Sequence, residues 1–414
     1  MYTSVPEWHY RKAMATLPMR PADPPAQVRR RPKDRKAQVE RAAAEAFSAF
    51  GYHAVGMEAI AAKVGISAAA LYRHYPSKYD LFCAAVLNLG QQLVDCTEID
   101  QQSDADALNP LIDALIDVTL ANRESGGLYR WQARYLRPPD QTRLSNQLRI
   151  VNRRIQEPLT AIRPGLTSSQ RWMISAALLS VIGSIVDHHL TMPATEIRAL
   201  FVAAGLRVLS AKLPLPDDDL PNPRRRPLFS DTGVYESLLH AAMVLFNERG
   251  YRETSVEQIA AAVGMPASGI YRYFSGKSDV LATVMRRAAD RVSGELSIIV
   301  GADDDPRDVL TQLIEAYVAT SFANPELAFV YYTERVNLSA ADDELLRNVQ
   351  RSTIDSWVQL LTSERPELTP SQARFLVHAA MAIVVDVGRL VHYDDSPHSQ
   401  ACVRKLMELT LFDS

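Results

Sequence analysis

The chain has 414 residues, more than a single hydrophobic core usually organises, so two or three domains are expected. Its composition, 47% hydrophobic and 22% charged, excludes a disordered chain and is typical of a globular protein. The net charge of −3 excludes a uniformly basic protein, so any binding of nucleic acid must depend on local basic patches.

The cysteines and the apolar segments indicate a cytoplasmic protein that does not enter a membrane. Three cysteines stand far apart (Cys83, Cys96 and Cys402), which argues against a disulfide framework and fits a reducing compartment. The N-terminus lacks the pattern of a secretory signal. The longest apolar run, Trp172–Val186, is short for a membrane span and predicts a buried helix.

Two proline-rich segments divide the chain. Residues 1–36 contain scattered prolines and end in the basic run RRRPKDRK, and residues 214–231 carry five prolines and a DDD block. Because proline lacks an amide hydrogen and fixes φ, neither segment favours a regular helix or a central strand. We expect a flexible basic arm over 1–36 and a linker over 214–231 that separates two halves of similar length.

The remaining residues predict an all-α protein. Apolar side chains recur at helical spacing after the arm and again after the linker. No alternating strand with a hairpin turn is recognisable in the sequence. The positions that define the two helical patterns are Val39, Ala42, Ala43, Ala46, Phe47 and Phe50, and then Leu238, Leu239, Ala242, Leu245 and Phe246.

The two halves repeat each other. Residues 47–81 align with 246–280 at an offset of 199 without a gap, and the sequence LYRHYPSK returns as IYRYFSGK. Farther on, RPGLTSSQ (Arg163–Gln170) returns as RPELTPSQ (Arg365–Gln372) at an offset of 202. A period this long indicates a duplicated domain and not a solenoid of short repeats.

Each copy contains the pattern of a helix-turn-helix. In the first, EAIAAKV is a short helix, Gly65 suits the positive φ of a helix exit, and Ser67 can cap the next helix. Small Ala61 allows the two helices to cross closely. In the second copy, Ala260 and Gly264 occupy the same places and Pro266 suits a first helical turn.

Polar residues at the end of the second short helix indicate DNA binding. Tyr72, Arg73 and His74 are consecutive, so they cannot all face the core, and Lys78 opens the following helix. Such side chains donate to phosphates and base edges. Alone, LYRHY is typical of any amphipathic helix, but the ordered set occurs twice at fixed internal spacing.

The stretches GYHAVGMEAIAAKVGISAAALYRHYPSKYDLF and GYRETSVEQIAAAVGMPASGIYRYFSGKSDVL resemble the N-terminal helix-turn-helix of the tetracycline-repressor (TetR) family. The remaining helices of each half match that family only in architecture. The resemblance implies that each half places a DNA-reading helix, with His74, Lys78 and Lys277 on phosphates. The implied DNA-binding residues are Ser67, Tyr72, Arg73, His74 and Lys78, and then Thr254, Ser255, Tyr271, Arg272, Tyr273 and Lys277.

The family usually has two hydroxyl residues where the first short helix opens. The second copy keeps them as Thr254 and Ser255, and Ser255 with Gln258 forms a capping-box pattern. The first copy has Val55 and Gly56 instead, which removes a hydroxyl–phosphate contact. We therefore expect two unequal DNA-binding heads, with the second better equipped, on an imperfect palindrome.

The basic segments before each head have two interpretations. Three arginines precede each copy, namely Arg29, Arg30 and Arg31, and then Arg224, Arg225 and Arg226. They could enter a minor groove or lie along phosphates, or they could form a solvated tail. The resulting division is a basic arm (1–36), a first helix-turn-helix domain (37–86), a first helical effector and dimerisation domain (87–213), a linker (214–231), a second helix-turn-helix domain (232–286) and a second helical domain (287–414).

In the TetR family the later helices hold a small-molecule pocket and the dimer interface. The apolar segments Trp172–Val186 and Ala373–Val391 match the pairing helices, so one chain could supply both sides as a pseudo-dimer. A homodimer of two chains is the alternative. The nominated ligand-binding residues are Trp131, Arg134, Tyr135, Tyr332 and Arg335, which could equally be core aromatics and interface arginines.

The sequence thus predicts a regulator that binds double-stranded DNA and acts as a repressor released by a small, apolar or acyl-type effector. The alternative is a ligand-sequestering protein whose first head has lost DNA recognition. No GxSxG, HExxH, P-loop or dinucleotide fingerprint is present, so no enzyme and no cofactor is expected. His188 and His189 are adjacent and lack the spacing of metal ligands, so no metal is expected.

Overall fold

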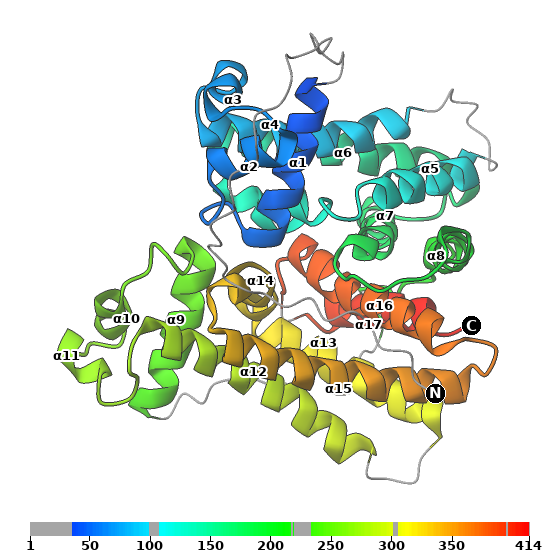
Figure 1. The fold of residues 1–414 in the computed structure, drawn as a ribbon. Helices are drawn as coiled ribbons and strands as arrows, with labels where there is room; N and C mark the ends of the chain where they lie inside the picture. Colours follow the sequence, from blue (N-terminus) through cyan, green and yellow to red (C-terminus); the bar gives the residue numbers. More distant parts are fainter. Residues whose placement is uncertain are drawn as a thin grey trace, which may run out of the picture. The chain divides into compact units, whose positions relative to one another are not determined.

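A computed structural model describes residues 35–98, 107–216, 218, 233–300, 305–394 and 396–413 (Figure 1). All the regular secondary structure in these residues is helical, as predicted. The first half contains α1 (Arg35–Phe50), α2 (Met57–Val64), α3 (Ala68–His74), α4 (Lys78–Cys96), α5 (Leu108–Ala121), η2 (Leu128–Gln132), η3 (Ala133–Tyr135), α6 (Pro138–Ile162), α7 (Ser168–Gly183), η4 (Ser184–Val186) and α8 (Ala194–Leu209).

The second half repeats this order. Its elements are α9 (Val234–Arg249), α10 (Val256–Ala262), α11 (Ala267–Ile270), α12 (Lys277–Val300), α13 (Pro306–Ala323), α14 (Pro325–Glu334), η5 (Arg335–Asn337), α15 (Ala340–Glu364), α16 (Pro370–Leu390) and α17 (Pro397–Leu411). The boundaries expected at residues 86 and 286 fall inside α4 and α12, because each of these helices continues from the helix-turn-helix into the later helical part.

Equivalent hydrogen bonds show that the duplication extends through both halves. Thr167 and Gln170 form a capping box on α7, and Thr369 and Gln372 form the same box on α16. Asn122 donates through Nδ2 to the carbonyl four residues earlier, and Asn324, 202 positions later, does the same. Each pair satisfies backbone groups that a helix end leaves unbonded. The two halves are therefore two copies of one structural unit, hereafter the first and second repeats.

Three hydrophobic cores organise the described residues. One lies inside each helix-turn-helix, around Phe47 and Phe82 in the first repeat and around Phe246 in the second. The third contains buried side chains of both repeats, among them Phe201 and Phe375. Because each fully buried large apolar side chain stabilises by about 1.5–3 kcal/mol, this shared core joins the repeats strongly.

The shared core includes a four-helix seam between the repeats. Helix α7 packs on α16, and α8 packs on α17 (Figure 1). The segment Ser168–Val186 is long and apolar enough to cross a membrane by composition, but 67% of it is buried inside the protein. Its apolar side chains thus pack in the seam, and the prediction of a buried helix over Trp172–Val186 is confirmed.

Candidate nucleic-acid interface and adjoining cavities

The first head is a short helix pair with an exposed polar end. Gly65 has φ +70°, the left-handed conformation that glycine adopts without strain, and it turns the chain from α2 into α3. Ser67 caps α3 by accepting a hydrogen bond from the amide of Ala70 at 3.2 Å. Leu71 is buried, whereas Tyr72 is 45% exposed and is followed by exposed Arg73 and His74.

The second head has the same turn but a shorter second helix. Gly264 also has φ +70°, and α11 ends at Ile270 instead of running through the equivalent of His74. Tyr271, Arg272 and Tyr273 are exposed in the turn that follows. The first head therefore exposes a Tyr–Arg–His set and the second exposes a Tyr–Arg–Tyr set. Because these side chains are exposed, solvent or DNA can satisfy their polar groups.

The structure gives the two lysines a role that differs from the expected phosphate contact. Nζ of Lys78 donates to the carbonyl oxygens of Tyr52, His53 and Val55 at 3.0, 3.3 and 3.1 Å. Lys277 makes the same three bonds, to Tyr251, Arg252 and Thr254, at 2.7, 3.4 and 2.8 Å.

Each lysine therefore ties the loop after the first helix of its head to the helix that the lysine itself opens. An ammonium group has three hydrogens, so these carbonyls use all of them. Each Nζ also lies over the tyrosine ring of its loop, 4.7 Å from Tyr52 and 4.4 Å from Tyr251. Burial lowers the pKa of both lysines.

The hydroxyl of Thr254 is also internal. Thr254 is 1% exposed, and its Oγ1 donates to the carbonyls of Leu245 and Gly250. Val55 is buried at the same place in the first head, so no hydroxyl–phosphate contact distinguishes the heads there. Ser255 does form the expected capping box with Gln258 on α10. Thr254 therefore does not support the expectation that the second head makes more contacts with DNA than the first.

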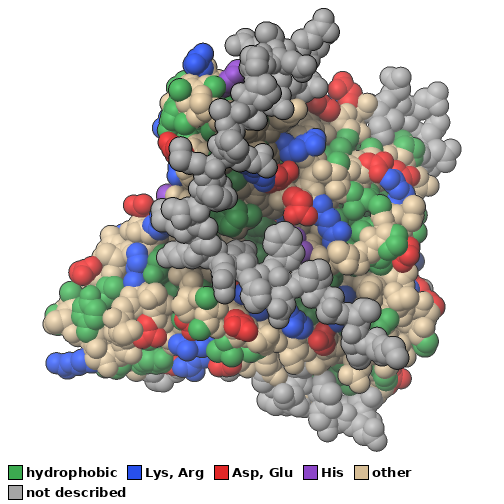
Figure 2. Space-filling view, in the orientation of Figure 1, with side chains coloured by type: hydrophobic (Ala, Val, Ile, Leu, Met, Phe, Trp, Pro, Cys, Tyr) green, Lys and Arg blue, Asp and Glu red, His purple; other side chains and the backbone are tan. Residues whose placement is uncertain are grey.

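The two groups of arginines in the arm and the linker lie outside the described residues. This applies to Arg29–Arg31 and to Arg224–Arg226. On the face shown in Figure 2, acidic and basic side chains are interspersed over both repeats. A uniformly basic surface is not visible there, which agrees with the net charge of −3.

The nominated ligand residues mostly meet at the seam and not inside one pocket. The rings of Trp131 and Tyr332 stack across the repeats, with centroids 4.1 Å apart and planes 12° apart. Trp131 donates through Nε1 to Asp187 at 2.8 Å. Arg335 pairs with Asp343 within the second repeat. Of these residues, Tyr332 alone lines one of the two cavities described below.

Arg134 forms a buried ion pair with Glu334 of the other repeat. The side chain of Glu334 is 2% exposed and that of Arg134 is 16% exposed. Arg134 also donates to the hydroxyl of Tyr135 at 2.7 Å, and both residues line a shallow surface depression. Arg134 therefore contributes to the pairing of the two repeats, which corresponds to the alternative interpretation of this residue as an interface arginine.

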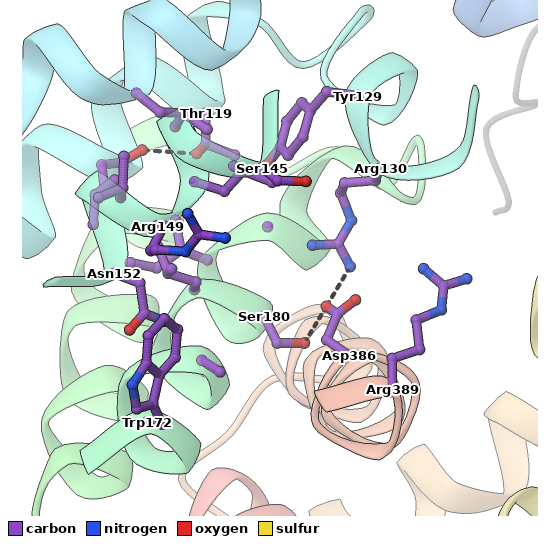
Figure 3. A pocket seen from close by; sticks show the side chains of 18 residues that line it. Thr119, Tyr129, Arg130, Ser145, Arg149, Asn152, Trp172, Ser180, Asp386 and Arg389 are labelled. Atoms are coloured by element: carbon purple, nitrogen blue, oxygen red, sulfur yellow. Dashed lines mark hydrogen bonds and ion pairs between the residues drawn. The ribbon is translucent and has the colours of Figure 1, made fainter. Parts of the chain in front are cut away.

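The first repeat contains a cavity of about 470 Å³ that residues of both repeats line (Figure 3). Nη2 of Arg130 lies 2.8 Å from Asp386 of α16 and 3.1 Å from Asp187, and Ser180 donates to Asp386 at 2.7 Å. The bare Cα of Gly183 leaves space for the guanidinium of Arg130, which a Cβ would fill. The sequence alone nominated Arg134 as a ligand-binding residue and missed Arg130 and Arg389, which line this cavity. Nothing in the sequence separates these arginines, because their positions depend on how the two repeats pack at the seam.

The second repeat contains a cavity of about 150 Å³ with a different lining. Four tyrosines surround it, together with His378, Asn324 and apolar side chains from α12, α14, α15 and α16. The tyrosines are Tyr317, Tyr331, Tyr332 and Tyr393. The hydroxyl of Tyr393 donates to the carbonyl of Val385 at 3.0 Å, and Tyr331 hydrogen-bonds to Gln350.

Two histidines meet at the seam. The ring centroids of His188 and His378 are 4.6 Å apart, and Phe375 packs edge-on against His188. Both ring nitrogens of His188 are buried without a hydrogen-bond partner. Burial, with the neighbouring His378 and Arg123, lowers the pKa of His188 from 6.5 to about 2, and burial with Arg374 lowers that of His378 to about 4.

We expect this pair to make the protein sensitive to acid. A histidine whose pKa is lowered by folding contributes stability above its unfolded pKa and loses it as the pH falls. From pH 6.5 towards 4, each histidine should cost about 1.4 kcal/mol of unfolding free energy per pH unit. Thermal unfolding measured across this range should show a shallower decline for His188→Phe than for the exposed control His74→Gln. Equal slopes for both variants would contradict the assignment.

Comparison with known proteins agrees with this architecture. The family model described as "Bacterial regulatory proteins, tetR family" matches residues 41–85 and 238–284, which are the two helix-turn-helix units. The transcriptional repressor KstR2 of Rhodococcus jostii is 30% identical over 109 residues, or 26% of this chain and 53% of that protein. The transcriptional activator FasR of Mycolicibacterium smegmatis is 43% identical over 68 residues, or 16% of this chain and 31% of that protein.

The chain thus spans about half or less of the length of these curated relatives. Among solved structures, KstR2 of Mycobacterium tuberculosis is 22% identical with a TM-score of 0.38, over 45% of this chain and 97% of that chain. The duplicated head followed by helices defines a tandem helix-turn-helix protein. Each of the two helix-turn-helix units, at residues 41–85 and 238–284, matches the tetR family of bacterial regulatory proteins, so the chain contains two tandem TetR-like units.

Proposed function

We propose that the protein is a transcriptional regulator that binds double-stranded DNA through both heads and acts by binding, without catalysis. The observation that carries this proposal is the exposed set Tyr72–His74 at the end of α3 and its counterpart Tyr271–Tyr273 after α11. Exposed tyrosine and arginine side chains at such a helix end can contact phosphates and base edges in a major groove. The expected target is an imperfect palindrome, because the two sets differ.

Arg73→Ala and Arg272→Ala should each weaken binding to the DNA upstream of the protein's own gene by tenfold or more, since each removes a charged DNA contact. Thermal stability should not change, because both side chains are exposed. Fluorescence anisotropy over a salt series measures affinity and its salt dependence together. Arg153→Ala, on the exposed face of α6, is the matched control.

Intact affinity in both variants would contradict the assignment of the heads. A protein that binds no DNA but still binds small molecules would support the alternative of a ligand-sequestering protein. If Arg272→Ala alone weakens binding, the first head has lost its contact with DNA, as that alternative also implies.

We also propose that one chain forms a complete pseudo-dimer. At the offset of 202, Gln132 is equivalent to Glu334, and Arg134 is equivalent to Val336. The geometry agrees: Gly51 of the first head lies beside Gln132 and Val336, and Gly250 of the second lies beside Glu334 and Arg134. Each pair contains one residue from each repeat.

Pairing of unlike repeats is therefore favoured over pairing of like repeats. Two second repeats would place Val336 against the buried Glu334 and leave the carboxylate without its arginine, a loss of several kcal/mol. We expect a solution mass near 46.0 kDa by sedimentation equilibrium. A species of twice that mass that persists on dilution would indicate that chains pair with each other instead.

The later helices of each repeat supply cavities for a small effector, and the proposed regulator is a cytoplasmic repressor that the effector releases. Helices α4 and α12 run from the heads into the helical part of each repeat. A ligand that favours one packing of these helices changes the separation of the heads, which must match one turn of DNA. Release of upstream DNA by a bound ligand, measured by anisotropy, tests this step.

A further inference from the structure

The two cavities lie at equivalent places in the two repeats but have different chemistry. At the offset of 202, Thr119 corresponds to Ser321, Tyr129 to Tyr331, and Ala176 to His378, and all six line their cavities. Arg130 of the first cavity corresponds to Tyr332 of the second. A symmetric homodimer would have two identical sites, whereas here an arginine has been exchanged for a tyrosine.

We propose that the chain binds two unlike small molecules at once, an amphiphile with an anionic group in the first repeat and an uncharged aromatic or hydroxyl-bearing molecule in the second. This inference rests on the proposed effector-binding function, which it extends to two ligand classes.

The lining of the first cavity favours an anion. Three arginines line it, namely Arg130, Arg149 and Arg389, together with Asp386. Arg130 already pairs with Asp386 and with Asp187, so Arg149 and Arg389 remain for an anion. Arg389 lies over the rings of Trp131 and Phe329, and its Nη2 is buried without a hydrogen-bond partner. Arg149 is exposed and donates only to Asn146, so it is available to an incoming acid. A carboxylate or phosphate would supply the missing acceptor.

The apolar part of such a ligand has a place beside these cations. Leu115, Leu148 and Val151 line the same cavity, and Trp172 adds an aromatic wall. A volume of about 470 Å³ accommodates a medium-length acyl chain with its head group. The combination of apolar walls and guanidinium groups therefore selects an anionic amphiphile.

The second cavity excludes charge. None of the described residues that line it is a lysine, arginine, aspartate or glutamate, and His378 is neutral at pH 7 because burial lowers its pKa to about 4. Transfer of an ion into such a site without a partner is strongly unfavourable. Tyrosine rings and the hydroxyls of Tyr317 and Tyr332 instead suit a small aromatic molecule.

A series of side-chain contacts connects the two cavities, so the two ligands should influence each other. Tyr332 lines the second cavity and stacks on Trp131. Trp131 donates to Asp187, which pairs with Arg130 of the first cavity. A ligand that shifts Tyr332 therefore shifts the group that orients Arg130, and by linkage the coupling must be reciprocal.

Isothermal titration of the full chain without DNA tests this proposal with two pairs of matched probes. In the first cavity, octanoate should bind at least tenfold more tightly than octanol. In the second cavity, benzyl alcohol should bind and benzoate should not. Benzyl alcohol should still bind when octanoate is present at saturation. The alkyl phosphate of the same length distinguishes a phosphate from a carboxylate head group.

Variants assign each probe to its cavity. Ala176→Trp should abolish octanoate binding alone, and Ala289→Phe should abolish benzyl alcohol binding alone, because each narrows one cavity. Arg149→Gln should weaken octanoate about tenfold without affecting octanol. Trp131→Leu should make the two affinities independent of each other.

Competition between octanoate and benzyl alcohol for one site, or loss of both probes in the same variant, would overturn the proposal. So would equal binding of octanoate and octanol, or no binding of any probe at millimolar concentration. The natural protein is tested in parallel on its upstream DNA. If DNA binding persists while the probes fail, only this inference fails, whereas loss of DNA binding bears on the proposed function.

Discussion

Arg134→Glu is expected to destabilise the protein by about 3–5 kcal/mol, because it places a second carboxylate against the buried Glu334. The contact joins the η2–η3 segment of the first repeat to the second repeat, so both the seam and the second head lose support. Urea unfolding followed by circular dichroism measures the loss. The double variant Arg134→Glu/Glu334→Arg restores opposite charges and should recover most of the stability.

The matched control for this prediction is Arg143→Glu. Arg143 pairs with Asp140 on α6, but its side chain is 68% exposed, and an exposed pair contributes about 0–1 kcal/mol. A similar small effect of Arg134→Glu and Arg143→Glu would show that the buried pair does not hold the repeats together. Failure of the double variant to recover stability would show that shape, and not charge, determines this contact.

Lys78→Met and Lys277→Met are expected to lower the stability of their own heads, each by about 2–3 kcal/mol. The apolar side chain keeps most of the packing but leaves three partly buried carbonyls without their donor. Hydrogen exchange of the amides in α2 and α10 should accelerate in the corresponding variant. The salt dependence of DNA binding should keep its slope once binding is measured at a temperature where the head is folded.

Arg73→Ala is the control that separates the two roles. It removes an exposed cation, so the salt slope should decrease while amide exchange in α2 stays unchanged. The opposite pattern would be a reduced salt slope of DNA binding for Lys78→Met with unchanged amide exchange in α2. It would show that the lysines contact phosphates, as the TetR resemblance implied.

The duplication and the helix-turn-helix could be predicted from sequence because their signals are local. Gly65 and Gly264 mark turns that need positive φ, and the polar run after each turn cannot be fully buried. Helical periodicity likewise predicted the all-α fold, and the drift from 199 to 202 between halves was visible in the RPGLTSSQ motif.

The roles of Lys78 and Thr254 could not be predicted in this way. The partners of Lys78 are main-chain carbonyls more than 20 residues earlier, which no side-chain pattern reveals. The resemblance assigned the hydroxyl of Thr254 to DNA, yet Thr254 is buried at the place that apolar Val55 occupies in the first head. A β-branched side chain can replace another there, because its hydroxyl finds carbonyls inside the head.

The cavity residues were the least predictable. Trp131 and Tyr332 were nominated as ligand-binding residues, but they stack on each other, and this stacking depends on how the two repeats pack across the seam. The same holds for Asp386, which comes from the second repeat to meet Arg130 of the first. Contacts of this kind depend on tertiary placement alone.

The seam of α7 and α8 with α16 and α17 has a further consequence, because both of its sides are encoded in one chain. In the proposed pseudo-dimer, formation of the seam does not depend on protein concentration, since the partner surfaces are covalently tethered and dilution cannot separate them. Each substitution also changes one position of the assembled seam, whereas in a symmetric homodimer the same substitution changes two positions. Under the proposed function, a substitution in one half therefore changes the ligand or the DNA sequence of that half while the other half stays as it was.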